Sequence, residues 1–168
     1  VRGAIALDNL DAQIAAMRAQ GSAMFDTQGV SAELAVNGLL DGLVPGVTGR
    51  MLGDLSLTPE TLLLDAQIAD ARMGDLRVRA ANLRAEGPFN AIAARFDMRG
   101  RLRQAPLAFA GTAALDLDGA STLRVEGRGT LADAEVFTRA PIEAAWQNGR
   151  MDASLNVAIG DGVVQAQW

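Results

Sequence analysis

Residues 141–159 read Pro-Ile-Glu-Ala-Ala-Trp-Gln-Asn-Gly-Arg-Met-Asp-Ala-Ser-Leu-Asn-Val-Ala-Ile, and this stretch decides the fold class. In its second half, apolar residues at the odd positions from Met151 to Ile159 alternate with polar or small residues at the even positions. A period of two is typical of a strand with one buried side, and Asn148-Gly149 favours a tight type I′ turn. The stretch therefore predicts a β-hairpin.

The same alternation recurs along most of the chain. Residues 113–125 repeat it on both sides of Asp118-Gly119, which predicts a second hairpin. Further alternating runs occupy residues 62–68, 76–80 and 92–98, and weaker ones lie upstream. Turn signals separate these runs, so we expect a mainly β fold, a long antiparallel meander of roughly ten strands.

The alternation changes phase between residues 76 and 85. Leu76, Val78 and Ala80 are in step with one another, whereas Leu83 and Ala85 follow the opposite phase. One extra residue in one of two paired strands produces such a slip. We therefore predict a β-bulge in this strand.

One segment, residues 39–52, has a different period. Leu39, Leu43, Val47 and Met51 recur every four residues, which is close to the period of a helix, although Pro45 interrupts the run. The pattern predicts two short helical turns, the second beginning at Pro45. This amphipathic stretch would either cover an open end or edge of the sheet or gate access to an interior groove.

The composition removes most enzyme chemistry. The chain has 168 residues, of which 49% are hydrophobic and 21% charged, with a net charge of -5 and no cysteine, histidine or lysine. Disulfides, the usual zinc sites and nucleophiles that need a thiol, an imidazole or a lysine base are therefore excluded. The acidic balance also disfavours nucleic-acid binding. We expect a folded protein that is not an enzyme and needs no cofactor.

A pair of carboxylates is the remaining catalytic candidate. Asp116 and Asp118 would lie on one side of a strand, about 7 Å apart, as acid and base do in some glycosidases. Because Gly119 follows directly, a solvated turn explains the two side chains better. No acidic run has the spacing of a calcium loop, so we assign no catalytic or metal-binding residue.

Arginines gather on one predicted strand. Arg95, Arg99, Arg101 and Arg103 all have odd numbers and would share one face, unless Gly100 disturbs the register. Such a stripe suits contact with anionic lipid headgroups, although charged residues on the outer face of a sheet are usually just solvated.

The apolar side of the predicted sheet consists mainly of leucine, alanine, valine, isoleucine and methionine, with few aromatic residues. Side chains of this kind suit a groove for acyl chains, and they equally suit the core of an ordinary β-sandwich. For the groove, the candidate lining residues are Leu76, Val78, Ile92, Phe96, Leu115, Leu117, Leu123, Val125, Ile142, Trp146, Leu155 and Val157.

Many of the predicted strands are rich in alanine and leucine and end in Gly-x-Leu steps, as in residues 73–83 and 123–131. In this respect the chain resembles the AsmA-like envelope proteins of Gram-negative bacteria, a group that includes TamB-type and YdbH-type proteins. The resemblance implies a long sheet curled into a groove or half-barrel that carries phospholipids across the periplasm and supports outer-membrane integrity. It supplies no catalytic residues.

The resemblance also sets expectations for location and partners. Strand-like patterns at both ends, residues 1–7 and 162–168, indicate that residues 1–168 are one β-rich section of a longer protein. The rest of that polypeptide would flank the section at both ends and anchor it to the inner membrane from outside this chain. Phospholipid acyl chains are the expected ligands, and an outer-membrane protein is a further candidate partner. The alternative is a structural or outer-membrane-assembly module with a closed core and no lipid conduit.

Overall fold

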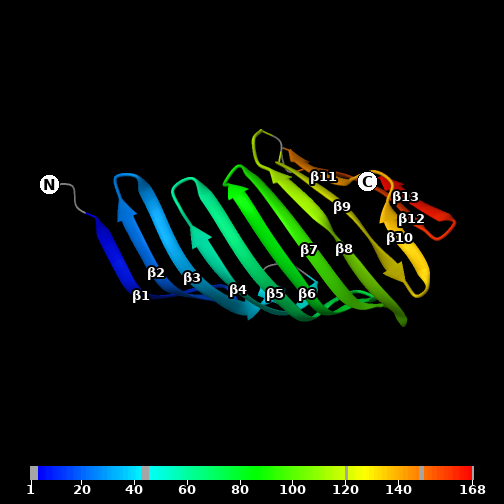
Figure 1. Cartoon of the computed structure of the whole chain (residues 1–168), viewed down its shortest axis with the longest axis horizontal. Coiled ribbons are helices and arrows are strands. Elements are labelled where there is room, and N and C mark those ends of the chain that lie inside the picture. The colour runs from blue at the N-terminus through cyan, green and yellow to red at the C-terminus, as the bar shows by residue number, and fades with distance from the viewer. Residues whose placement is uncertain (1–3, 43–45, 120, 148–149, 168) are drawn as a thin grey trace.

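The computed structural model describes residues 4–42, 46–119, 121–147 and 150–167. In these residues the chain forms thirteen strands of one antiparallel sheet and a single short 3-10 helix, η1. Figure 1 shows the strands side by side in one layer, with β1 and β13 toward opposite ends of the molecule. The elements in chain order are β1 (Ile5–Ile14), β2 (Met17–Asp26), β3 (Gly29–Leu39), η1 (Leu40–Gly42), β4 (Val47–Leu57), β5 (Thr61–Met73), β6 (Leu76–Pro88), β7 (Ala91–Leu102), β8 (Ala105–Asp116), β9 (Ser121–Leu131), β10 (Ala134–Thr138), β11 (Ile142–Gln147), β12 (Arg150–Ile159) and β13 (Gly162–Gln167).

The sheet is a meander, because each strand from β1 to β9 pairs with the next one in sequence. β10 and β11 together occupy one position: both pair with β9 on one side and with β12 on the other. Pro141 lies in the gap between them, and proline has no N–H to donate to a ladder. β13 continues the sheet beyond β12. The predicted mainly β meander is confirmed, whereas the curl into a groove stays a prediction.

The gap between β10 and β11 leaves part of β9 without a ladder partner, and a side chain takes that place. The Thr138 hydroxyl accepts a hydrogen bond from the Gly127 backbone N–H at 3.1 Å and donates one to the Gly127 carbonyl at 3.3 Å. Both groups are partly buried. One hydroxyl therefore satisfies both polar groups of Gly127 where the strand is broken.

Replacing Thr138 by valine keeps the side-chain shape and removes both hydrogen bonds. Because the Gly127 groups then lose their partner while partly buried, we expect the free energy of unfolding to fall by about 1–2 kcal/mol. Urea unfolding followed by circular dichroism measures this change. Thr130→Val is the control, because Thr130 is an exposed residue of β9. We expect its free energy of unfolding to change by no more than about 0.5 kcal/mol. An equal loss in both variants would contradict this role for Thr138.

The pairing register divides the side chains into two faces. We call the side of the sheet that carries Ile92, Phe96, Leu115 and Leu123, together with the residues that share that side through the register, the apolar face, and the other side the polar face. Directly paired residues of antiparallel strands point to the same side, so the register can be followed from β1 to β13. At the paired positions with described side chains, the apolar face carries no charged residue.

No second layer covers either face within the described residues, and the burial reflects this. The buried hydrophobic residues are mostly alanines, and no large described side chain is fully buried. The solvent-accessible surface is 11328 Å², whereas the scaling for a compact monomer of 17.5 kDa gives about 7,900 Å². The single sheet thus exposes far more surface than a globular domain of this size.

The two predicted hairpins are confirmed. β11 pairs with β12 through Gln147 and Arg150, and β8 pairs with β9 through Asp116 and Thr122. The predicted type I′ turn at Asn148-Gly149 lies outside the described residues. The roughly ten strands expected from turn spacing are too few, since the described part of the chain already forms thirteen.

The predicted β-bulge is also confirmed. The register between β6 and β7 shifts between Val78 and Ala80, so that Arg79 is the extra residue. The register between β4 and β5 also shifts. There Asp70 of β5 is the extra residue, and its φ is 54°. Asp70 and Arg79 lie at the same level of the β5–β6 pair, so the two irregularities form one double bulge.

The helical prediction for residues 39–52 is wrong except for η1. Val47–Leu57 forms strand β4, and Pro45 lies outside the described residues. The error has a physical cause: the apolar face of β4 includes Gly49 and Gly53, which add no hydrophobic side chain. An alternation of Val47 and Met51 with glycine between them has an apparent period of four.

Candidate functional site

The apolar face is the candidate site, and it contains the predicted lining residues. All of those that lie in strands are on this one side of the sheet, and Leu117 directly follows β8. Ile92, Leu115 and Leu123 are directly paired across β7, β8 and β9, so they form a row of contacting side chains. Leu76 and Val78 lie toward the opposite end of the strands, opposite Leu102 and Gly100. The predicted residues therefore share a surface and do not surround one closed pocket.

The sequence-based set covered only part of this face. Leu62 and Leu64 of β5 lie on it, paired with Leu57 and Leu55 of β4, although only the later strands contributed to the predicted lining. The alternation in residues 62–68 was the signal that identified this strand. The face extends across all the strands, from β1 to β13, and the lining is correspondingly longer than predicted.

The apolar face is long enough to hold several acyl chains. Neighbouring strands lie 4.7–4.9 Å apart, so the sheet measures roughly 50 Å across its strands. One leaflet of a bilayer contributes about half of a hydrocarbon thickness of about 30 Å. Two or three chains in line would therefore fit along the sheet. Several large residues of the face are well exposed, among them Ile5 at 63% and Trp146 at 40%.

Two aromatic rings lie beside glycines at the centre of the apolar face. The rings of Phe96 and Phe109 stack with their centroids 6.1 Å apart. Phe96 is paired with Gly111, which is paired with Gly127, and the Phe109 ring lies where a side chain on Gly127 would be. The glycines thus leave room for the rings to lie down on the sheet. The two stacked rings and the glycines beside them form the middle of the apolar face.

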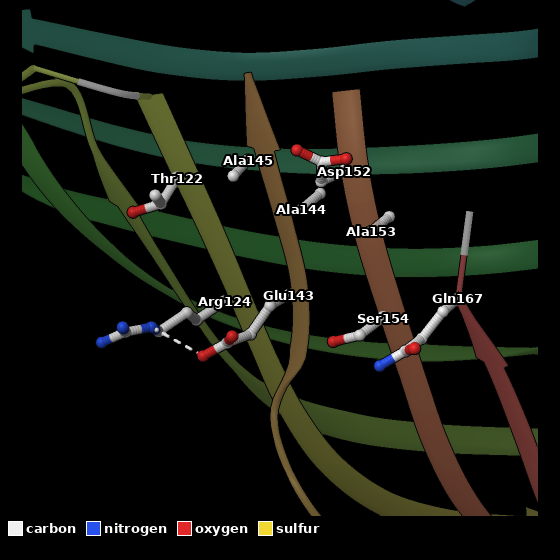
Figure 2. Close-up of a pocket in the computed structure, with 9 residues that line it drawn as sticks. All are labelled: Thr122, Arg124, Glu143, Ala144, Ala145, Asp152, Ala153, Ser154 and Gln167. Atoms are coloured by element: carbon white, nitrogen blue, oxygen red, sulfur yellow. Dashed lines mark ion pairs between the residues drawn. The ribbon is translucent and has the colours of Figure 1, made fainter. Parts of the chain in front are cut away.

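The polar face has several open hollows, one of which is drawn in Figure 2. It has a volume of about 520 Å³ and is lined by residues of β9, β11, β12 and β13. Arg124 and Glu143 are directly paired across β9 and β11 and form an ion pair at 3.0 Å. Asp152 lies one strand further. Glu143 is thus engaged by Arg124, whereas Asp152 is directly paired with Ala145 of β11.

The carboxylates considered from the sequence support a turn. Asp116 accepts a hydrogen bond from the backbone N–H of Asp118 at 2.9 Å, and Asp118 accepts one from Asn90 at 2.8 Å. Both contacts hold neighbouring loops, as expected for aspartates at a turn. The described residues contain no cluster of three or more ligands suited to a metal ion. They also include no helix long and apolar enough to span a bilayer.

The predicted arginine stripe is placed on the polar face. Arg95, Arg99 and Arg101 point to that side, and the β7–β8 register continues unbroken past Gly100. Arg103 lies beyond the end of β7, in the turn, where it pairs with Asp75 at 3.1 Å. The stripe is therefore on the opposite side of the sheet from the predicted lining.

No protein-family model, curated protein sequence or solved structure matches the chain. The resemblance to AsmA-like envelope proteins accordingly stays a prediction from the residue pattern of the strands. The functional argument depends on the geometry of the two faces.

Proposed function

We propose that the apolar face binds phospholipid acyl chains and lets them move along the sheet, as one section of an AsmA-like protein that carries phospholipids between the membranes of the Gram-negative envelope. The observation that carries this proposal is a one-layer sheet whose apolar face, at the described paired positions, has no charged side chain. A surface of this size exposed to water is unfavourable and generally indicates a binding partner.

The energetics of lipid transfer favour such a surface. Exposing a tail of about sixteen carbons to water costs on the order of 10 kcal/mol, at roughly 0.8 kcal/mol per CH₂. Contact with a continuous apolar face removes most of that cost. The aliphatic side chains and the glycines around Phe96 and Phe109 offer similar, shallow contacts along the sheet, so no single position traps the lipid.

The charged side chains of the polar face keep that side of the sheet hydrated. Exposed cross-strand ion pairs join Arg84 to Asp65 and Arg124 to Glu143 on the polar face. Arg18 donates to Asp11 and holds the pKa of that carboxyl below its usual value. Charges of both signs keep this face hydrated, while the other face is left for lipid.

Mass spectrometry of protein purified without detergent from a Gram-negative host tests the proposal. We expect phospholipid to copurify and labelled phospholipid to pass faster between vesicles when the protein is added. Protein that carries no phospholipid and leaves the transfer rate unchanged would refute the proposal. That result would favour the alternative, a structural module whose apolar face is closed by another part of its protein.

A further inference from the structure

We propose that five arginines on the polar face form a binding site for a phosphate-bearing ligand. These arginines line a single open hollow of about 770 Å³, near the turns that join β5 to β6 and β7 to β8. The five are Arg72, Arg77, Arg79, Arg99 and Arg101. The site is on the opposite side of the sheet from the proposed acyl-chain surface, so it does not depend on that function.

The central feature of the hollow is a row of like charges. Arg72 is directly paired with Arg77, and Arg77 is directly paired with Arg101. Directly opposed residues have Cβ atoms about 5 Å apart, and like charges at that separation destabilise a sheet. Arg99 lies two residues before Arg101 on the same strand and side. The bulge residue Arg79 adds a fifth cation to the same hollow.

Carboxylates do not compensate this row. Among the described residues, no ion pair within 4.0 Å involves any of the five arginines. Asp70 is the acidic residue that borders the hollow. The chain as a whole is acidic, with a net charge of -5 from 15 cations and 20 anions. A third of its cations in one hollow is therefore a concentration that the composition does not explain.

A neighbouring hollow shows how the same face arranges arginines elsewhere. That hollow has a volume of about 440 Å³ and combines Arg84, Arg95 and Arg124 with Glu86 and Glu126. Arg84 and Arg124 both have carboxylate partners. The mixed hollow has two glutamates for three arginines, whereas the five-arginine hollow has one aspartate, Asp70, for five.

Phosphate is the anion that fits the donors present. A guanidinium offers five N–H donors in a planar fork that binds phosphate oxygens in pairs. Three arginines on adjacent strands span about 10 Å, which suits one phosphate group held by two or three forks, or two neighbouring groups. The phosphate can come from a lipid headgroup at a membrane surface or from a soluble phosphate compound. Both sources share this chemistry.

The test compares two double variants on the same face. Arg77→Gln with Arg101→Gln removes two neighbours of the row, and Arg84→Gln with Arg124→Gln removes two arginines of the mixed hollow. Inorganic phosphate is compared with chloride at equal ionic strength by thermal unfolding. Flotation with phosphatidylglycerol vesicles, against phosphatidylcholine vesicles, tests the headgroup as the source. Circular dichroism confirms that each variant is folded.

We expect phosphate to raise the Tm, or anionic vesicles to bind, for the wild type and the Arg84/Arg124 variant but not for the Arg77/Arg101 variant. Vesicle binding alone identifies a membrane headgroup, and a phosphate effect alone identifies a soluble compound. In chloride at low salt, the Arg77/Arg101 variant should have the higher Tm, because repulsion is relieved. The proposal is overturned by equal behaviour of the two variants, by no response in either arm, or by a lower Tm of the Arg77/Arg101 variant in chloride.

Discussion

Leu115→Glu should reduce the amount of bound phospholipid at least about tenfold, a difference of about 1.4 kcal/mol or more. Leu115 is in the row with Ile92 and Leu123 on the apolar face, near the end of the strands where β8 turns into β9. A carboxylate there would have to lose water against an acyl chain, with no cation to pair with at the described paired positions of that face, and such burial costs several kcal/mol. Lipid extraction and mass spectrometry of the purified variant measure the loss.

The adjacent residue on the same strand provides the control. Ala114 points to the polar face, where it is paired with Ala93 and Arg124. Ala114→Glu places the same charge one residue away, beside a cation, so phospholipid binding should be unchanged. The far-ultraviolet circular dichroism of both variants should match the wild type. Equal lipid content in the two folded variants would contradict the assignment of lipid to the apolar face.

Gly111→Ala should lower the free energy of unfolding by about 2–3 kcal/mol, at the upper end of the range for overpacking. A Cβ at this position would lie 2.0 Å from the backbone oxygen of Glu126 and 2.9 Å from the Cα of Gly127. Neither atom can move without opening the β8–β9 ladder. The methyl group would also lie beside Phe96, which is paired with Gly111. Urea unfolding followed by circular dichroism gives the change.

A glycine with open space is the matched control for this variant. The nearest atom to a Cβ on Gly162 would be 3.4 Å away, an ordinary van der Waals contact. Gly162→Ala should therefore leave the free energy of unfolding within about 0.5 kcal/mol of the wild type. If Gly111→Ala were as mild as Gly162→Ala, the close approach of β8 to β9 would be disproved.

The strands and even one irregularity were predictable because both depend on local alternation. The period of two in residues 113–125 and 151–159 predicted the hairpins, and the phase change between Ala80 and Leu83 predicted a bulge in β6, which the structure places at Arg79. The same reasoning failed in residues 47–52, where glycine at apolar positions made a strand look helical. The period of the hydrophobic residues indicates a strand or a helix only where the buried positions carry side chains.

The sequence predicted more of the apolar face than of the five-arginine hollow on the polar face. The apolar face follows from alternation within each strand, so its predicted members fell on one side. The five-arginine hollow depends on pairing between strands. Arg99 and Arg101 were visible as part of a stripe, but their approach to Arg77 and Arg72 depends on the registers of β5, β6 and β7. Such registers are set by the whole sheet and are not readable from one strand.

The most direct test of the account uses two adjacent leucines of β5. Leu64 is on the apolar face, paired with Leu55 and Ala85, and Leu63 is on the polar face, paired with Ser56 and Glu86. A single tryptophan is placed at either position after Trp146→Phe and Trp168→Phe, and phospholipid with brominated acyl chains is added as a quencher. The account predicts strong quenching of tryptophan fluorescence at position 64 and little at position 63. Equal quenching at both positions, or none at position 64, would contradict it.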